Sequence, residues 1–367
     1  MRSNLIDAGV DVFIVGAGPA GAAAAISLSQ IAPHLRVCLA DAGRDRPFRV
    51  GESVPPPIKP FLDHLGLGPA FIQADHCPSF HTLSAWGGQE LIGNEFFLYV
   101  HNTGWRLDRD RFDRMLADEA TRLGAKPLTA TVRSLSPCAQ GWRIDCGAAG
   151  KFAARFVIDA SGRSALLPRL LKIPSVKIDK LVACAVFFER QSVPDAPGAD
   201  AAVIESFRDG WWYSAAIPGS RRVAMLMTDA DIARQLRVSQ LPAWMACLAE
   251  TRHIQPLIAS CRPLAPPAFW SAASRNFGSA YPFGILGIGD AISSFDPLSS
   301  QGIIKAIRSG LFASYAIADY FLRNDETGIA RYYALMNREF DAYLTTRHEY
   351  YRQEQRWPDA PFWNRRH

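Results

Sequence analysis

Residues 12–21 read VFIVGAGPAG, and this stretch decides the fold. Its first four residues are β-branched or aromatic, which is typical of a short strand buried on both faces. Three glycines follow (Gly16, Gly18 and Gly21), and then an alanine-rich helical stretch that runs to about residue 31. A second apolar run over residues 36–40 ends at Asp41, twenty residues beyond Gly21. The order of strand, glycine-rich turn, helix and strand predicts a Rossmann-like unit that binds a dinucleotide.

Each part of this unit has a physical task. Gly16 permits the tight turn, Gly18 lets the backbone approach a pyrophosphate, and Gly21 lets the helix pack close to the sheet. The unpaired N–H groups and the positive dipole end of the helix attract phosphates, and Asp41 is placed to accept hydrogen bonds from a ribose. We therefore expect Gly16, Gly18, Ala20, Gly21 and Asp41 to contact the cofactor; a glycine-rich turn without a ligand is the alternative.

The composition indicates an ordinary globular chain. It has 367 residues, of which 49% are hydrophobic and 20% charged, with a formal net charge of +5. Lys and Arg are spread along the chain, which argues against nucleic-acid binding. Five arginines gather near the end, and we interpret them as a solvated helix face and tail, with a site for an acidic partner as the alternative: Arg347, Arg352, Arg356, Arg365 and Arg366.

The cysteines and the apolar segments bear on location. The seven cysteines form no CxxC pair, which favours a reducing compartment and argues against structural zinc. The segment from His76 to His81 lacks further residues at ligand spacing, so we expect no metal site. No signal peptide is visible, and glycines and a proline interrupt the most apolar window, residues 12–32. We expect a cytoplasmic protein without a membrane span.

Three later segments resemble those of FAD-dependent aromatic hydroxylases. Residues 156–164 (FVIDASGRS) resemble the strand followed by the DxxG segment of that family, and residues 107–113 (LDRDRFD) resemble its RxxF helix start. Residues 287–291 (GIGDA) and the following DP and QGI resemble its late GD motif and helix start. The resemblance implies that FAD contacts Arg109, Asp159, Gly162, Asp290, Pro297, Gly302 and Ile303. Because only one dinucleotide fingerprint is present, electrons would come from NAD(P)H directly or through a separate flavin reductase.

These segments together predict an α/β fold with a single Rossmann-like FAD-binding domain of the aromatic-hydroxylase type. We assign residues 1–78, 106–175 and 276–322 to it. Strand-like pieces in residues 79–105 and 176–275 predict an inserted antiparallel β-sheet that forms a substrate domain. Residues 240–260 within it are predicted to be helical, and residues 323–367 form C-terminal helices.

The loop VGESVP, residues 50–55, resembles the GES loop that lies beside the isoalloxazine in flavin-dependent tryptophan halogenases. The resemblance makes Glu52 and Ser53 cofactor contacts; a proline-stiffened connector is the alternative. Residues 210–218 (GWWYSAAIP) stand where halogenases carry W-x-W-x-I-P, but Tyr213 and Ala215 replace the two tryptophans. Residues 78–86 contain no lysine, whereas halogenases need one between flavin and substrate. We therefore expect oxygen transfer rather than halogenation.

The loop GESVPPP (residues 51–57), the segment GWWYSA (210–215) and the ending RWPDAPFW (356–363) carry a narrower resemblance. They resemble the flavoprotein maturases of tryptophylquinone-containing oxidases. It implies a monooxygenase in which reduced FAD and O2 form a C4a-hydroperoxide that hydroxylates an electron-rich aromatic. The substrate would be an indole or tryptophan-like small molecule, or a tryptophan in a client polypeptide. Two alternatives stay open: a reductase of isoprenoid double bonds, similar to geranylgeranyl reductases, and a non-catalytic flavin-binding maturation partner.

The residues for proton transfer and substrate binding follow from chemistry alone. His81 and Glu52 are the candidates for handling protons, although His81 could be an ordinary hydrogen-bonded histidine. Trp86, Trp211, Trp212 and Tyr213 could line an aromatic pocket, and packing within the sheet is the alternative.

Overall fold

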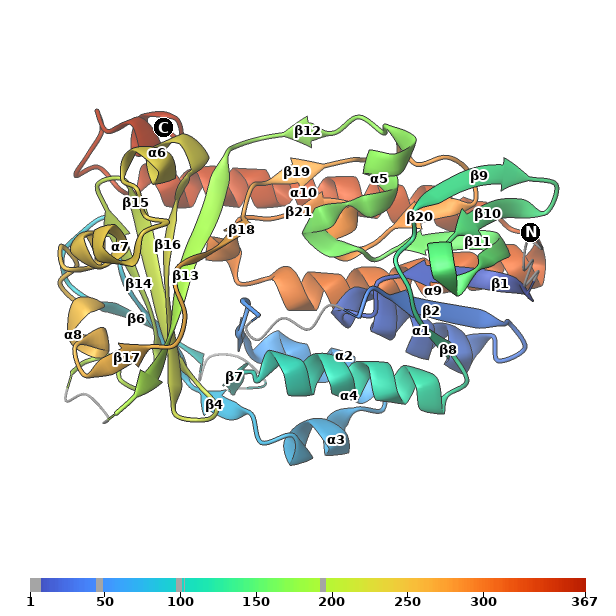
Figure 1. Ribbon diagram of the computed structural model, residues 1–367, viewed down its shortest axis with the longest axis horizontal. Helices are drawn as coiled ribbons and strands as arrows, with labels where there is room; N and C mark the ends of the chain where they lie inside the picture. The colour runs from blue at the N-terminus through green and yellow to red at the C-terminus, as the bar shows by residue number, and fades with distance from the viewer. Residues whose placement is uncertain (1–7, 44–48, 97–100, 102, 192–195) are drawn as a thin grey trace.

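Two sheets lie at opposite ends of the molecule, and long helices run between them (Figure 1). The computed structural model describes residues 8–43, 49–96, 101, 103–191 and 196–367. The arrangement confirms the predicted α/β fold with a second sheet and C-terminal helices.

The first sheet has seven strands in the order β8-β2-β1-β11-β10-β9, with β20 paired to β11. Strands β8, β2, β1, β11 and β20 are mutually parallel, whereas β10 and β9 add an antiparallel hairpin at one edge. The strands are β1 (Ala8–Val15), β2 (Val37–Asp41), β8 (Lys126–Thr129), β9 (Ser134–Cys138), β10 (Gly141–Asp145), β11 (Lys151–Asp159) and β20 (Ile285–Gly287). All of them lie in the ranges expected for the FAD-binding domain; the division into domains itself stays a prediction.

Helix α1 (Pro19–Ile31) packs between this sheet and α9 (Gly302–Arg323). The small residues of α1 make close packing possible, since Ala22, Ala23, Ala24 and Ala25 are all fully buried. The approach of α9 is so close that a Cβ on Gly310 would lie 2.5 Å from the backbone oxygen of Ala20. The glycine and alanine content of α1 is therefore explained by packing on both of its sides.

The second sheet has eight strands in the order β17-β13-β16-β15-β14-β5-β6, with β18 also paired to β13. It is antiparallel except for the pairing of β14 with β5. The strands are β5 (His81–Ala85), β6 (Ile92–Glu95), β13 (Leu181–Arg190), β14 (Ala202–Phe207), β15 (Gly210–Ile217), β16 (Arg221–Asp229), β17 (Cys261–Pro263) and β18 (Ala268–Ser271). They lie in the ranges expected for the inserted domain.

The two faces of the eight-stranded sheet bury different clusters. The inner face, defined here by Trp211, Ala215 and Met225, packs against the C-terminal segment and also contacts Val50 and Leu298. The outer face, defined by Trp212, Ala224 and Leu226, is covered by three short helices. These are α6 (Ala230–Gln235), α7 (Leu241–Leu248) and α8 (Gln255–Ile258).

The expected continuous helix over residues 240–260 is wrong, because it is split into α7 and α8. The carboxylate of Glu205 in β14 accepts hydrogen bonds from the backbone N–H groups of Arg252, His253 and Ile254 at 2.6, 2.9 and 3.1 Å. These three N–H groups therefore do not form helical hydrogen bonds. A contact with a distant strand thus ends the helix at a place that the local sequence does not specify.

Two three-stranded sheets and several short helices join the halves. One sheet has the order β3-β7-β4, with β3 (Ser53–Val54), β4 (Cys77–Ser79) and β7 (Gly104–Arg106). The other has the order β12-β19-β21, with β12 (Val176–Lys177), β19 (Arg275–Asn276) and β21 (Ser293–Ser294). The remaining helices of this region are α2 (Lys59–His64), α3 (Gly68–Gln73), α4 (Arg109–Arg122) and α5 (Leu166–Leu171).

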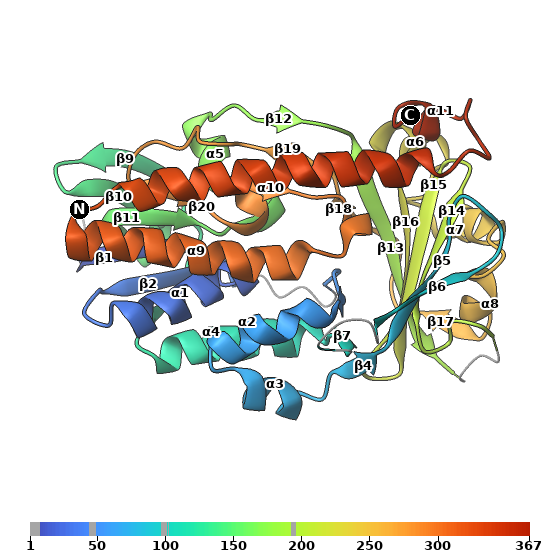
Figure 2. The same ribbon diagram turned by 180° about the vertical axis from the view of Figure 1, so that it is seen from behind.

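Helix α10 (Thr327–Arg352) runs beside α9 and continues to the eight-stranded sheet, where the short α11 (Pro361–Asn364) ends the fold (Figure 2). Trp363 of α11 is fully buried, and its Nε1 donates to the backbone oxygen of Phe207 at 3.0 Å. The C-terminal segment is therefore part of the core of the second half.

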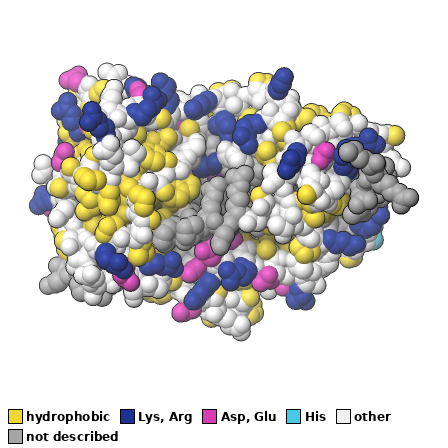
Figure 3. All heavy atoms as spheres, in the orientation of Figure 1, with side chains coloured by type: hydrophobic (Ala, Val, Ile, Leu, Met, Phe, Trp, Pro, Cys, Tyr) yellow, Lys and Arg dark blue, Asp and Glu magenta, His cyan; other side chains and the backbone are white. Residues whose placement is uncertain are grey.

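The surface differs between the halves. In the space-filling view, apolar side chains gather over the half that holds the eight-stranded sheet (Figure 3). Large apolar side chains in this half with substantial exposure include Met245 (37%), Leu264 (37%) and Phe269 (45%). Contiguous exposed apolar surface is typical of interaction sites. No helix in the described part of the chain is long and apolar enough to cross a bilayer.

Candidate functional site

The turn between β1 and α1 is built from glycines that no other residue could replace. Gly16 has φ +113°, and a Cβ there would lie 2.4 Å from the backbone oxygen of Ala160. A Cβ on Gly21 would lie 1.9 Å from the backbone oxygen of Gly16. Ala20 is buried between Gly289 and Gly310, so its small side chain serves helix packing.

Gly18, in contrast, faces open space, since a Cβ there would meet nothing within 4 Å. It is the N-cap of α1. The first N–H groups of a helix have no intrahelical partners, and the first turn of α1 holds no acidic side chain that could pair with them. Asp41 at the end of β2 lies next to this turn, and its carboxylate accepts hydrogen bonds from Ala17 N at 3.3 Å and Gly43 N at 2.8 Å. A bare helix N-terminus beside a carboxylate fits a pyrophosphate followed by a ribose.

The end of β11 brings a second loop to this edge of the sheet. Asp159 is fully buried, and its carboxylate accepts hydrogen bonds from Ser161 N at 3.0 Å and Leu167 N at 3.2 Å. Burial raises the pKa of this carboxyl. Asp159 therefore shapes the loop from beneath, whereas Gly162, with φ +65° and no atom near its Cβ position, is at the open side. A contact of Asp159 with FAD stays a prediction.

Asp290 lies in a polar cluster that the sequence only partly indicated. Its carboxylate is 2.8 Å from Nζ of Lys305 and 3.3 Å from Nε of Arg163. Burial opposes ionisation, but these two cations outweigh it, so the pKa of Asp290 is lowered. Lys305 is only 2% exposed, bonds to the backbone oxygen of Ser293 and lies 4.3 Å from the centre of the Phe295 ring.

Lys305 was not predicted from the sequence to belong to the site. The available signal was a lone lysine on an apolar helix face, since its neighbours Ile303, Ile304 and Ile307 are all buried. Arg163, which directly follows Gly162 of the DxxG segment, was also missed. It donates to the backbone oxygens of Ala273 and Phe295 at 3.2 and 2.6 Å.

The start of α9 forms the third part of the candidate cofactor site. Pro297 begins a short 3-10 helix, η6 (Pro297–Ser299), and α9 follows at Gly302. The first turn of α9 has no side-chain cap and no acidic residue, and a Cβ on Gly302 would face open space. Ile303, the next residue, is largely buried. This free helix N-terminus is suited to the negatively charged edge of a reduced flavin.

The loop that contains Glu52 and Ser53 reaches from the cofactor half to the eight-stranded sheet. Arg109 at the start of α4 holds this loop, because its Nη1 donates to the backbone oxygens of Val50 and Gly51 at 2.8 and 3.2 Å. Its Nη2 also pairs with Asp113 at 3.1 Å. Arg109 therefore positions the loop, and a direct contact with FAD stays a prediction.

Glu52 is the least satisfied charged side chain of the region. It is 1% exposed, and its Oε2 accepts a hydrogen bond from Gly51 N at 3.1 Å. Its Oε1 has no hydrogen-bond partner among the described residues. Burial raises the pKa of Glu52 to about 7. The side chain borders a small cleft between the cofactor half and the sheet, which Arg109, Phe187 and Ile217 also line.

Tyr213 of β15 meets the same loop from the inner face. Its hydroxyl lies 2.6 Å from Oγ of Ser53. Burial and then the negative charge of Glu52 raise the pKa of the Tyr213 phenol, which keeps it protonated. The structure thus brings together three residues that the sequence placed in different roles: Glu52, Ser53 and Tyr213.

The four aromatic residues expected in one pocket are divided between the two faces of the sheet. Trp211 and Trp86 pack together at the inner face, with ring centres 6.3 Å apart. Trp212 points to the outer face, where it is fully buried against Trp244 at 5.0 Å. Strand alternation separates Trp212 from the other three residues, so the four cannot line a single pocket.

His81 is not brought near Glu52. In the register of β5 and β14, Leu83 pairs with Val203, and both pack at the outer face. Successive side chains of a strand alternate between faces, so His81 shares the outer face with Leu83. This face is opposite to the one that holds Tyr213, and a role of His81 in proton transfer stays a prediction.

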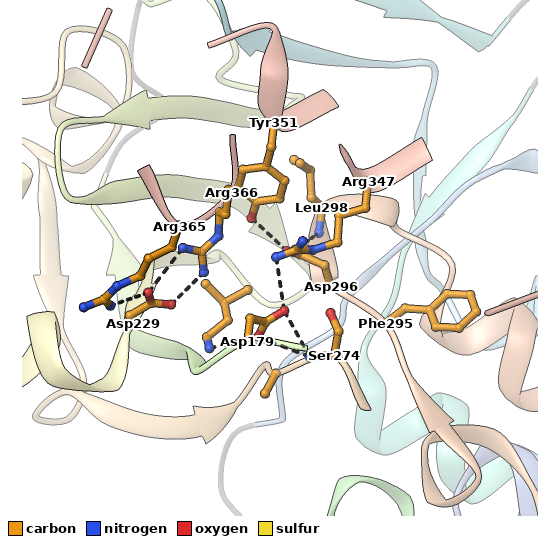
Figure 4. A network of polar contacts seen from close by, with 12 residues as sticks. Asp179, Asp229, Ser274, Phe295, Asp296, Leu298, Arg347, Tyr351, Arg365 and Arg366 are labelled. Carbon is orange, nitrogen blue, oxygen red and sulfur yellow. Dashed lines mark hydrogen bonds and ion pairs between the residues drawn. The ribbon is translucent and has the colours of Figure 1, made fainter. Parts of the chain in front are cut away.

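Two of the C-terminal arginines also differ from the sequence-based interpretation. Arg366 is 5% exposed and its Nη2 pairs with Asp229 at 2.6 Å. Arg347 pairs with Asp179 at 3.1 Å and lies 3.5 Å from Asp296 (Figure 4). The expected solvated face and tail is wrong for these two residues, because carboxylates distant in the sequence enclose them.

Comparison with known proteins identifies the family. The profile of the tryptophan halogenase family matches residues 11–85 and 89–367. This chain belongs to the tryptophan halogenase family. LodB of Marinomonas mediterranea, described as an FAD-dependent oxidoreductase, is 30% identical over 97% of this chain and 96% of its own length. The tryptophan 2-halogenase of Chondromyces crocatus is 23% identical over 83% of this chain and 60% of its own length.

Solved structures of this family have the same fold. The myxobacterial chondrochloren halogenase CndH superimposes with a TM-score of 0.86 at 21% identity, covering 98% of this chain and 86% of CndH. The peptidyl tryptophan dihydroxylase QhpG, essential for tryptophylquinone cofactor biogenesis, gives 0.73 at 27% identity, covering 98% of this chain and 79% of QhpG. The predicted resemblance to flavin-dependent halogenases is confirmed, and this member of the tryptophan halogenase family is an FAD-dependent oxidoreductase.

Proposed function

We propose that this family member is an FAD-dependent monooxygenase that hydroxylates the indole of a tryptophan, carried by a client polypeptide. In the overall reaction, NAD(P)H would supply two electrons, directly or through a flavin reductase. One atom of O2 enters the ring and the other leaves as water. FAD supplies the oxygen activation when it is bound.

The absence of a suitably placed lysine is the observation that carries this proposal. Halogenation requires a lysine between flavin and substrate, and residues 78–86, which form most of β4 and β5, contain none. Lys59 in α2 pairs with Asp63 at 2.5 Å and its side chain is 52% exposed, while Lys305 is enclosed by Asp290. No lysine lines the cleft beside Glu52.

The residues of this chain have defined tasks in such a reaction. The turns at Gly18, Gly162 and Gly302 would hold FAD, and Asp41 would bind its ribose. Glu52, with its pKa near neutrality and one free oxygen, can accept or hold a proton at working pH. Tyr213 and Ser53 form a short hydrogen bond beside it, which joins the loop to the inner face of the sheet.

A polypeptide as substrate is supported by two observations. QhpG, which acts on a peptidyl tryptophan, matches this chain over 98% of its length. The exposed apolar side chains of the second half, such as Leu264 and Phe269, offer surface for a client chain. Halogenation is the competing function, because several relatives are halogenases.

The test is a mass measurement on the FAD-loaded protein with a flavin reductase, NADH, labelled O2 and bromide. Free tryptophan and a tryptophan-containing client polypeptide encoded beside the gene serve as substrates. The expected result is a gain of one or two labelled oxygens on the polypeptide. Bromine on the product would establish a halogenase, and a gain of two hydrogens on an isoprenoid would establish a reductase.

The matched control is Gly18→Glu, which faces open space and so should fold, but places a negative charge where the pyrophosphate would bind. It should show no product. If the variant still supported maturation of the client polypeptide without bound FAD, catalysis would be contradicted. The protein would then be a maturation partner that only binds its client.

A further inference from the structure

The hydroxyl of Tyr351 joins the eight-stranded sheet to the loop that precedes α9. Tyr351 lies near the end of α10 and is fully buried. Its hydroxyl accepts a hydrogen bond from Nε1 of Trp211 at 3.1 Å and donates one to Oδ2 of Asp296 at 2.8 Å. One atom thus connects the inner face of β15 with the segment that enters η6. Figure 4 shows its bond to Asp296.

Asp296 transmits this contact to the start of α9. Its Oδ1 accepts a hydrogen bond from Leu298 N at 3.0 Å, so the carboxylate caps η6. The backbone N–H of Asp296 donates to the hydroxyl of Tyr343 at 2.7 Å, and Arg347 lies 3.5 Å from Oδ2. Three side chains of α10 therefore fix both the main chain and the side chain of the residue before Pro297.

Trp211 is the second end of the connection. It lies two residues before Tyr213 on the same face of β15, and Tyr213 bonds to Ser53 at 2.6 Å. The inner face of β15 is therefore hydrogen-bonded to two loops of the candidate flavin site. Tyr213 reaches the Glu52 loop directly, and Trp211 reaches the η6 loop through Tyr351.

We propose that Tyr351 is a positioning residue for the flavin, which acts through Asp296 on the start of α9 and responds to Trp211 on the substrate sheet. This inference rests on the flavin site of the proposed function. If Tyr351 served packing alone, loss of its hydroxyl would lower stability and leave the bound flavin unchanged. If it positions the loop, the same loss leaves the buried N–H of Trp211 without its acceptor. It also leaves Oδ2 of Asp296 with Arg347 at 3.5 Å in place of a hydrogen bond at 2.8 Å, and the loop should shift.

The experiment compares Tyr351→Phe with Tyr333→Phe in the holoenzyme. Tyr333 lies on the same helix, and its hydroxyl donates to the backbone oxygen of Ile285 at 3.2 Å, in β20 of the other sheet. The measurements are the FAD dissociation constant, the visible spectrum and reduction potential of the bound flavin, and Tm. We expect Tyr351→Phe to weaken FAD binding about five- to tenfold and to shift the flavin spectrum. Tyr333→Phe should change FAD binding less than about twofold.

A second pair keeps the test decisive if Tyr351→Phe does not fold. Trp211→Phe removes the hydrogen bond at the sheet end, whereas Trp212→Phe changes the adjacent residue on the outer face, whose Nε1 has no partner among the described residues. Only Trp211→Phe should alter the flavin spectrum. Equal spectra for both pairs, with lowered Tm, would overturn the proposal. Because no substrate and no turnover are needed, the outcome is independent of whether hydroxylation is observed.

Discussion

The turn after β1 and the inner face of β15 are constructed in opposite ways. The turn is made of backbone, and the residues on which its shape depends lie within six consecutive positions, Gly16 to Gly21. The inner face is made of side chains from distant segments, such as Glu52, Tyr213 and Tyr351. The first region would bind groups common to all dinucleotides, whereas the second depends on particular side chains brought together by the fold.

This difference explains which chemistry each region can perform. Helix N-termini and glycine turns bind phosphate through N–H groups that every residue possesses, so only the shape of the chain matters. A site for proton transfer needs particular atoms at particular distances, such as the 2.6 Å between Ser53 and Tyr213. Substitutions in the two regions should therefore fail in different ways.

The largest effect is expected at Gly21. Gly21→Ala places a Cβ 1.9 Å from the backbone oxygen of Gly16, so the turn must open. We expect FAD affinity to fall by about 100-fold or more, which corresponds to about 3 kcal/mol. Retained flavin absorbance after gel filtration measures this. Gly9→Ala, at a position in β1 with nothing within 4 Å of the Cβ, is the matched control and should retain FAD.

Gly18→Ala separates binding from folding within the same turn. Its Cβ would meet no protein atom, so Tm without FAD should equal that of the wild type, while FAD affinity drops about tenfold. Equal FAD affinity in Gly18→Ala and wild type would show that the pyrophosphate does not approach this glycine.

The turn after β1 could be predicted from the sequence better than the side chains gathered at the inner face of β15. Gly16, Gly21 and Asp41 could be identified because their spacing is local and each type has one physical reason. The face on which His81 lies could not be predicted, because it depends on the pairing of β5 with β14, which the local sequence does not encode. Lys305 and Tyr351 were missed because their partners, Asp290 and Asp296, are 15 and 55 residues away.

On stability, the largest effect is expected at the ion pair of α9. Asp290→Asn leaves Lys305, 2% exposed, without its carboxylate at 2.8 Å. We expect the free energy of unfolding to fall by about 3 kcal/mol, because an unpaired buried charge remains. Urea unfolding of the holoenzyme measures this. In the double variant with Lys305→Met, part of the loss should return; a simple sum of two losses would mean that the pair is not coupled.

A pH-dependent effect is expected at Glu52. Its pKa of about 7 in the folded state lies above the ordinary carboxyl value, so the folded state binds more protons than the unfolded state between the two values. Stability is then present at low pH and decreases as the pH rises toward 7, by about 3 kcal/mol at most. Glu52→Gln should remove this decrease, as followed by Tm between pH 4.5 and 8. Parallel pH profiles for the variant and wild type would contradict a raised pKa.

The smallest effect is expected at His81, and it tests the two faces of the sheet directly. Tyr213→Phe, on the inner face, breaks the hydrogen bond to Ser53 and should lower hydroxylation about tenfold or more. His81→Gln, on the outer face, should change it less than about twofold, because the side chain does not face Glu52. Product formation per FAD is the measurement for both. If His81→Gln were the more damaging change, the chemistry would lie on the outer face, and the assignment of Glu52 and Tyr213 to the reaction would be wrong.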